Sequence, residues 1–439
     1  MLVLKIKRHF TLYMTLWFLF FSQSISVFAQ APEDIIPPCF TGNELTKVRE
    51  WEKTWVGKRV NYANVDQVKD LLPDFLVNMI KEPKKWGASE LWFELVPYRY
   101  CTPSKSILEA IKKYSPLAKL SPEVFKITWG QVGPNEWLEG YDKGELAGYP
   151  FPNPKTGMEM AWNFDSVTMG DNRIQETEGD VVNCRTGWER HAVNTGKFMY
   201  WTGRTYVPPI PKIENNPKRI RLTQHVFNLE PPDGYGNQFL TVQYLNPQKE
   251  DDSFLWMAMY RRIRKMSTTQ KSETIDGRDA SYRDDLGYTG HINRNTYKFL
   301  EARNMLSARH QDKSKMVKQK GSGAWSGAQR ERCKLYLVEM HDKDPGRVYS
   351  KEILYLDGET WLAVYKESWD LQGRLWRCMD AQNGYEMSVQ REPVPCMIGH
   401  TFIDIQRLHG SPALSRKQQF GIELSLDIFN PQYMQRSGY

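Results

Sequence analysis

The chain has 439 residues, a formal net charge of +7 and 13% aromatic residues, among them 15 tryptophans. Because this positive charge is small for the length, nothing indicates a nucleic-acid partner. The eight histidines are scattered and lack the spacing of metal-ligand motifs, so neither a metal nor another cofactor is predicted.

Residues 1–29 have the pattern of a secretory signal peptide. A basic patch around Lys5 precedes an apolar run over residues 12–21, and small or β-branched residues lead to the end at Ala29. The apolar run is short for a membrane span, which favours cleavage after Ala29; the alternative is an uncleaved N-terminal anchor. Cleavage removes three positive charges and leaves an exported chain of charge +4.

Residues 30–139 are predicted to form a mixed, helix-rich region. Residues 41–44 offer a capping box, with Thr41 ahead of apolar residues at helical spacing. The remaining chain, residues 140–439, is mostly strand and predicts a second region built on an antiparallel sheet. Residues 310–332 are basic and rich in Gly and Ser, so a mobile loop is expected there.

The clearest sheet signal is a run of four apolar strands over residues 334–378. Turn residues separate them, including Asp357-Gly358, where a two-residue turn would pair Leu354 with Trp361. Both faces of these strands carry large apolar groups. We therefore expect one face to be covered by the core and the other to line an apolar space.

The six cysteines favour disulfide bonds in an exported chain. We predict one bridge between Cys378, at the end of the four-strand run, and Cys396. The intervening Asn383-Gly384 would turn the chain back so that the two thiols meet.

Aromatic residues on the predicted strands are the candidate ligand contacts. Two interpretations stay open, because a large sheet with few helices can bury its aromatics in a filled core or leave them around a cavity. The candidates are Trp256, Tyr260, Trp361, Tyr365 and Trp376.

A basic cluster follows the apolar strand that ends at Tyr260. It could attract an anionic group or a protein partner, although cations also protect the edges of sheets from unwanted pairing. Its members are Arg261, Arg262, Arg264 and Lys265.

One candidate for acid–base or metal chemistry is the carboxylate pair Asp284-Asp285 with nearby His291. Adjacent side chains in a strand or loop point apart, which favours a solvated turn instead. No catalytic residue is therefore predicted, and the chain is not expected to be an enzyme.

Several segments together resemble a bacterial family catalogued as domain of unknown function 1329. They run from Gly148 to Asn163, Trp256 to Lys265, Arg278 to Asp284, Arg347 to Trp361 and Gly373 to Arg377. The resemblance implies an α+β fold similar to the periplasmic lipoprotein carriers of the Lol type: a large curved antiparallel sheet forming a half-open β-barrel, with helices plugging its concave side. It also implies a periplasmic location, with association with the outer membrane left open.

These observations favour an exported carrier or adaptor that binds a lipid or other apolar molecule. The resemblance further implies that such a carrier would serve a resistance-nodulation-division transporter or outer-membrane trafficking. The alternative is a cell-envelope glycan-binding protein or glycoside hydrolase that uses the same aromatics as sugar platforms. A scaffold with a filled core is a third reading. A dry aliphatic cavity would favour the carrier, whereas two facing carboxylates would favour the hydrolase.

Overall fold

The structure is a computed structural model that describes residues 31–122, 136–167, 169–266, 274 and 277–438. The predicted signal peptide and its cleavage site lie outside these residues. Within this part of the chain, no helix is both long and apolar enough to cross a membrane.

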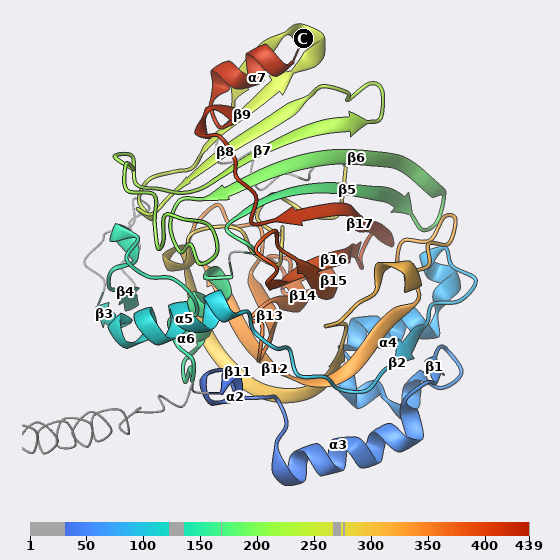
Figure 1. Ribbon diagram of the computed structural model, residues 1–439. Coiled ribbons are helices and arrows are strands. Elements are labelled where there is room, and N and C mark those ends of the chain that lie inside the picture. The colour runs from blue at the N-terminus through green and yellow to red at the C-terminus, as the bar shows by residue number, and fades with distance from the viewer. Residues whose placement is uncertain (1–30, 123–135, 168, 267–273, 275–276, 439) are drawn as a thin grey trace, which may run out of the picture.

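One large curved sheet dominates the fold (Figure 1). Its strand order is β1-β2-β12-β13-β14-β15-β16-β17-β5-β6-β7-β8-β9-β10, with β11 beside β12, and every pairing is antiparallel except β2 with β12. Among the described strands, the edges β10 and β11 do not pair with each other, so the sheet is not a closed barrel. The N-terminal strands are β1 (Arg59–Val60) and β2 (Phe93–Leu95); the next are β5 (Asn172–Asn183), β6 (Gly187–Tyr200), β7 (Ile220–Glu230), β8 (Gln238–Tyr244), β9 (Asp252–Met257) and β10 (Arg262–Lys265); the last are β11 (Asn295–Ser307), β12 (Ala328–Asp342), β13 (Lys351–Asp357), β14 (Ala363–Trp369), β15 (Leu375–Met387), β16 (Pro393–Asp404) and β17 (His409–Phe420).

The helices are short and lie mostly in the N-terminal third. Thr156 and Glu159 form a capping box that starts α6, while Thr41 precedes α3 without making its side-chain bond. Strands β3 (Leu120–Pro122) and β4 (Glu136–Leu138) form a separate pair. The helices are α2 (Pro32–Ile35), α3 (Gly42–Trp55), α4 (Asp74–Lys81), α5 (Lys105–Tyr114), α6 (Gly157–Asp165) and α7 (Pro431–Ser437).

The strands of the four-strand run exist as predicted, but both of their faces are covered. Side chains such as Leu337 and Val364 pack with α4 on one face. Alternate side chains such as Val338 and Leu354 pack with α5 and α6 on the other. The expectation that one face lines an apolar space is therefore wrong for β12–β15.

Two predicted turns, one in this run and one just after it, are wrong. Strand β13 ends at Asp357 and β14 begins at Ala363, so Leu354 lies opposite Lys366 rather than Trp361. Asn383-Gly384 lies inside β15, at a β-bulge, and makes no turn. The two-residue turn fails because the connection is longer, with Trp361 at a positive φ of 58°.

The predicted disulfide is also wrong. Cys378 lies opposite Ile403 and Cys396 lies opposite Gly384, so the two cysteines are at different levels of the β15–β16 pair. All six cysteines, which the structure describes, are free thiols. The sequence argument depended on a turn at Asn383, and a continuous strand removes it.

The two predicted regions share one sheet. Strands β1 and β2 come from residues 30–139 and join it through parallel pairing of Phe93 with Ala328 at the start of β12. Strand β12 begins at Ala328, so the last residues of the loop predicted over residues 310–332 belong to this strand. The mobility of that loop stays a prediction.

Candidate ligand cavity

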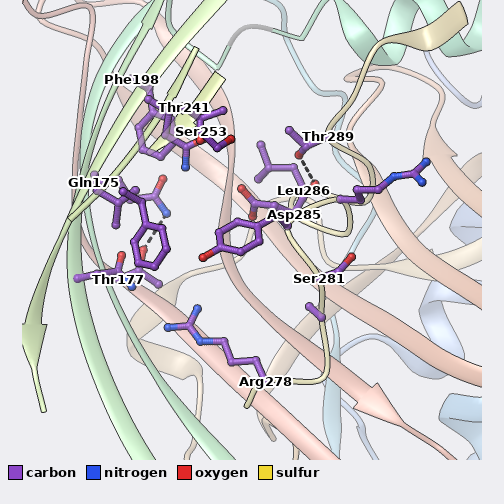
Figure 2. Close-up of a pocket in the computed structure, with 18 of the residues that line it drawn as sticks. Gln175, Thr177, Phe198, Thr241, Ser253, Arg278, Ser281, Asp285, Leu286 and Thr289 are labelled. Atoms are coloured by element: carbon purple, nitrogen blue, oxygen red, sulfur yellow. Dashed lines mark hydrogen bonds between the residues drawn. The ribbon is translucent and has the colours of Figure 1, made fainter. Parts of the chain in front are cut away.

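A cavity of about 190 Å³ lies between β5–β9 and the segment of residues 277–291 (Figure 2). Two other described cavities are far smaller, at about 20 and 30 Å³. A water needs about 10–15 Å³ by this measure, so the larger cavity has room for a small organic molecule. Strand residues such as Gln175 and Phe198 form one side, and Asp285 and Leu286 face them from the other.

The period of the strands determines which side chains reach the cavity. Alternate residues of β5, β6, β7 and β8 line it, because side chains along a strand point to opposite faces. The lining is mixed. Its apolar part includes Phe198, Phe239, Met397 and Phe402, and its polar part includes Gln175, Asn194, Gln224, Asn228 and Gln243.

Arg173 is the buried cation of this cavity. Its side chain lies on β5, where the residue is 4% exposed, and its guanidinium carbon lies 3.9 Å from the centroid of the Phe198 ring. Gly196 permits this arrangement, because a Cβ there would lie 2.7 Å from Phe198 Cε2. Burial lowers the pKa of Arg173, opposed by the nearby Tyr200 and Asp285.

Asp284 anchors the 277–291 segment to the sheet. Its carboxylate accepts hydrogen bonds from Lys366 Nζ at 2.7 Å, Tyr349 Oη at 2.9 Å and Ser281 Oγ at 2.7 Å. Lys366 also contacts Glu352, at 2.7 Å. Burial would raise the pKa of Asp284, but the Lys366 ammonium and the Ser281 bonds outweigh it and hold the pKa at about 2.

Asp285 points the other way and lines the cavity. Burial raises its pKa, although Arg173 and Arg278 oppose that shift. The prediction that these adjacent carboxylates point apart is confirmed, whereas the solvated turn is wrong because Asp284 is 4% exposed. His291 is buried against Trp137 and bonds the Leu245 carbonyl, at 2.9 Å from its Nε2.

A second anchor joins Asp279 to β17. His409 Nδ1 lies 2.8 Å from Asp279 Oδ2, and Ser411 Oγ donates to the same oxygen at 2.7 Å. Both bond one carboxylate rather than each other, so this is no nucleophile–base pair. Within the described part of the chain, no group of three or more His, Cys, Asp or Glu could hold a metal ion.

The predicted aromatic contacts are not brought together, and none of them lines this cavity. Trp256 is fully buried on the opposite face of β9, packed with Met434 of α7. Tyr260 is 65% exposed in the turn η6 (Ala258–Tyr260), so it does not share a strand face with Trp256. Ligand contact by any of the five stays a prediction.

The remaining three aromatics lie in the four-strand run. Trp361 precedes β14 and belongs to the core that includes α5 and α6, whereas Tyr365 belongs to the core on the other face. The predicted common face for this pair is therefore wrong, because a bulge lies between the strands. Trp376 is half-buried and donates from Nε1 to Asp404, at 2.9 Å.

The basic cluster lies on the hairpin at the edge of the sheet. Arg261 follows the turn η6, and Arg262, Arg264 and Lys265 are exposed on the edge strand β10. Lys265 pairs with Asp252 at 2.6 Å. This position agrees with edge protection, and contact with an anionic group or a partner stays a prediction.

Sequence reasoning predicted an apolar strand at β9 but did not identify β5–β7 as part of a cavity. The cavity-facing positions Arg173, Gln175, Thr177, Asn194, Gly196 and Phe198 are mostly polar or small, so they give little apolar signal. Those strands are not strongly apolar, because one face of them meets the cavity rather than the core.

A large curved sheet that is not closed, with few helices and a cavity on one face, defines a sheet-dominated α+β protein. The chain belongs to the family described as "Protein of unknown function (DUF1329)", whose sequence model matches residues 59–435. The predicted family membership is thus confirmed. No curated protein matches the sequence.

Solved structures with a similar fold share little sequence with this chain. An outer membrane lipoprotein-sorting protein domain, so described, from Vibrio parahaemolyticus is 17% identical, with 64% of this chain and 98% of that chain covered and a TM-score of 0.47. A DUF1329 family protein from Desulfovibrio piger is 13% identical, with 63% and 97% covered and a TM-score of 0.46. A LolA superfamily protein from Nitrosomonas europaea is 12% identical, with 64% and 100% covered and a TM-score of 0.40.

Proposed function

We propose that this protein is an exported carrier that holds one amphipathic molecule in the cavity against β5–β9. The observation that carries the proposal is the cavity itself, at about 190 Å³ and closed by a segment with buried ionic anchors. Burying an apolar body there gains about 25 cal/mol for each Å² removed from water. Binding, rather than a chemical step, is the proposed activity.

The mixed lining refines the predicted ligand from purely apolar to amphipathic. Phe198, Phe239 and Phe402 offer apolar contact, and amide side chains offer hydrogen bonds. Pockets of this kind use a few polar groups to orient a mainly apolar ligand. We also propose that the curved sheet is a half-open barrel. In this view α5, α6 and the 277–291 segment pack against its concave face.

Location and partners are part of the same proposal. The basic and apolar pattern of residues 1–29 supports export to the periplasm. The resemblance stated above supports service to a resistance-nodulation-division transporter or to outer-membrane trafficking. Mass measurement of the exported protein should give a chain that begins at Gln30.

One observation favours the alternative, a glycan-binding protein or glycoside hydrolase. Asp251 and Asp285 both line the cavity, and burial raises the pKa of Asp285, as in the general acid of such hydrolases. The amide-rich lining also suits sugar hydroxyl groups. A neutral oligosaccharide that competes for the cavity would support this alternative.

The test is a titration with the neutral fluorescent probe 1-N-phenylnaphthylamine. Thr241 on β8 lines the cavity, so T241W should fill it and abolish probe binding. T186W makes the same exchange at an exposed turn and serves as the control. Decanol should displace the probe and maltoheptaose should not. Equal binding by the wild type and both variants would place the probe elsewhere and contradict the proposal.

A further inference from the structure

Arg173 differs from the other deeply buried arginines of the described chain. Arg309 pairs with Asp357 and Arg330 with Asp380. Arg204 donates to Asn172 Oδ1, and Arg377 donates to Tyr349 Oη. Within the described residues, neither Nε nor Nη1 of Arg173 has a hydrogen-bond partner. A buried cation without such partners is costly, so its chemistry calls for an acceptor.

The contact that holds Arg173 leaves its donors available. The guanidinium carbon lies over the Phe198 ring, 3.9 Å from its centroid, which is a cation–π contact. Nε and Nη1 have no hydrogen-bond partner in the described part of the chain, and the N–H groups of a guanidinium form a planar fork from which an oxyanion can accept two hydrogen bonds in parallel. Because Arg173 lines the cavity, such an acceptor can come from a bound ligand.

The charges around Arg173 do not neutralise it by direct contact. Asp285 interacts with it electrostatically, but no hydrogen bond joins the two, and burial disfavours the charged form of Asp285. A second cation, Arg278, lines the same cavity and reaches toward the β5 side (Figure 2). His400, also in the lining, has its pKa lowered to about 3 by burial and by Arg278, so it is neutral near pH 7.

We infer that Arg173 binds the head group of the ligand, and that the ligand class is an apolar body carrying an oxyanion, such as a carboxylate or phosphate ester. The inference rests on the proposed function, because it assigns the polar end of a molecule held in the same cavity. Phe239 and Phe402 then contact the apolar body, while the guanidinium of Arg173 receives the oxyanion.

The experiment measures displacement of 1-N-phenylnaphthylamine from the full exported protein by decanoate, decyl phosphate and decanol. Hydrogen bonds to charged groups contribute enough to predict that one of the anions binds at least ~10-fold more tightly than decanol. R173M should remove that preference, lowering the affinity for the anions much more than the affinity for decanol. R173K, which keeps the charge without the planar fork, should retain part of it. R185M, at an exposed turn, is the control.

Each outcome separates the inference from the function it rests on. Decanol binding as tightly as both anions in the wild type would overturn the inference and leave the carrier intact, and this comparison needs no variant to fold. An equal loss for all three ligands in R173M would make Arg173 structural. Displacement by acetate or inorganic phosphate alone would assign the site to a free anion. Absence of probe binding by the wild type would remove the proposed function and the inference together.

Discussion

Replacing Asp284 and Asp285 by asparagine, one at a time, should have opposite effects on stability. In the folded protein the pKa of Asp284 is about 2, against an ordinary value of 3.8, because Lys366 and the Ser281 bonds outweigh burial. At 1.36 kcal/mol for each pH unit, this corresponds to about 2 kcal/mol. We therefore expect D284N to lower the free energy of unfolding by about that amount at pH 7.

The pH dependence follows from the sign of the shift. A carboxyl group whose pKa is depressed on folding stabilises the protein above pH 3.8, and the contribution disappears as the pH falls through about 2. The difference between wild type and D284N should narrow over that range. Asp285 has a raised pKa, so its charge opposes folding at pH 7, and D285N should be as stable as the wild type or more stable.

Urea unfolding followed by tryptophan fluorescence at pH 7 and at several acidic pH values measures both effects. The two variants change neighbouring residues by the same single atom exchange, which makes each the control for the other. Equal unfolding midpoints for D284N and D285N at pH 7 would refute the assignment of Asp284 as the anchor. A constant difference from pH 7 to pH 2 would refute its electrostatic origin.

Three further predictions follow from the same structure. W256A, which opens a fully buried site under α7, should cost about 3–5 kcal/mol of stability and leave probe affinity unchanged in the folded protein. F198A, at a cavity-lining residue, should weaken probe binding more than stability. The reverse pattern would place the ligand on the other face of the sheet. Alkylation in denaturant without reductant, read by mass spectrometry, should label all six cysteines, and a protected pair would contradict the free thiols. The hydrogen bond to Asp279 raises the pKa of His409, so H409N should lower stability most below pH 6.5. The stability difference between wild type and H409N should disappear as the pH rises through the raised pKa, and a difference that grows with pH would contradict this.

The sequence predicted the strands of the fold better than their faces. The four apolar runs became β12–β15 because turn residues and apolar period both pointed to antiparallel strands. Their register was missed at Trp361 and Asn383, since a longer connection and a bulge each change which face a residue occupies. The predicted disulfide and the predicted common face of Trp361 and Tyr365 failed for that reason, whereas Tyr260 does not share a face with Trp256 because it lies in the turn η6.

The position of the cavity was missed because β5–β7 lack a strong apolar signal. Arg173, Phe198 and Asp285 come from three different elements, and only the tertiary fold brings them to one space. In the sequence, Arg173 resembles any exposed strand cation, and its burial depends on the 277–291 segment closing over β5–β9. Local pattern carries no information on such an approach between distant segments.

The central claim is that the cavity against β5–β9 holds one ligand molecule. Native mass spectrometry of the protein purified without detergent tests it most directly, with wild type, T241W and T186W compared. We expect wild type and T186W to carry a co-purified molecule at one per chain, and T241W to carry none. The same bound mass on all three proteins, or a bare wild type that also fails to bind the probe, would contradict the account.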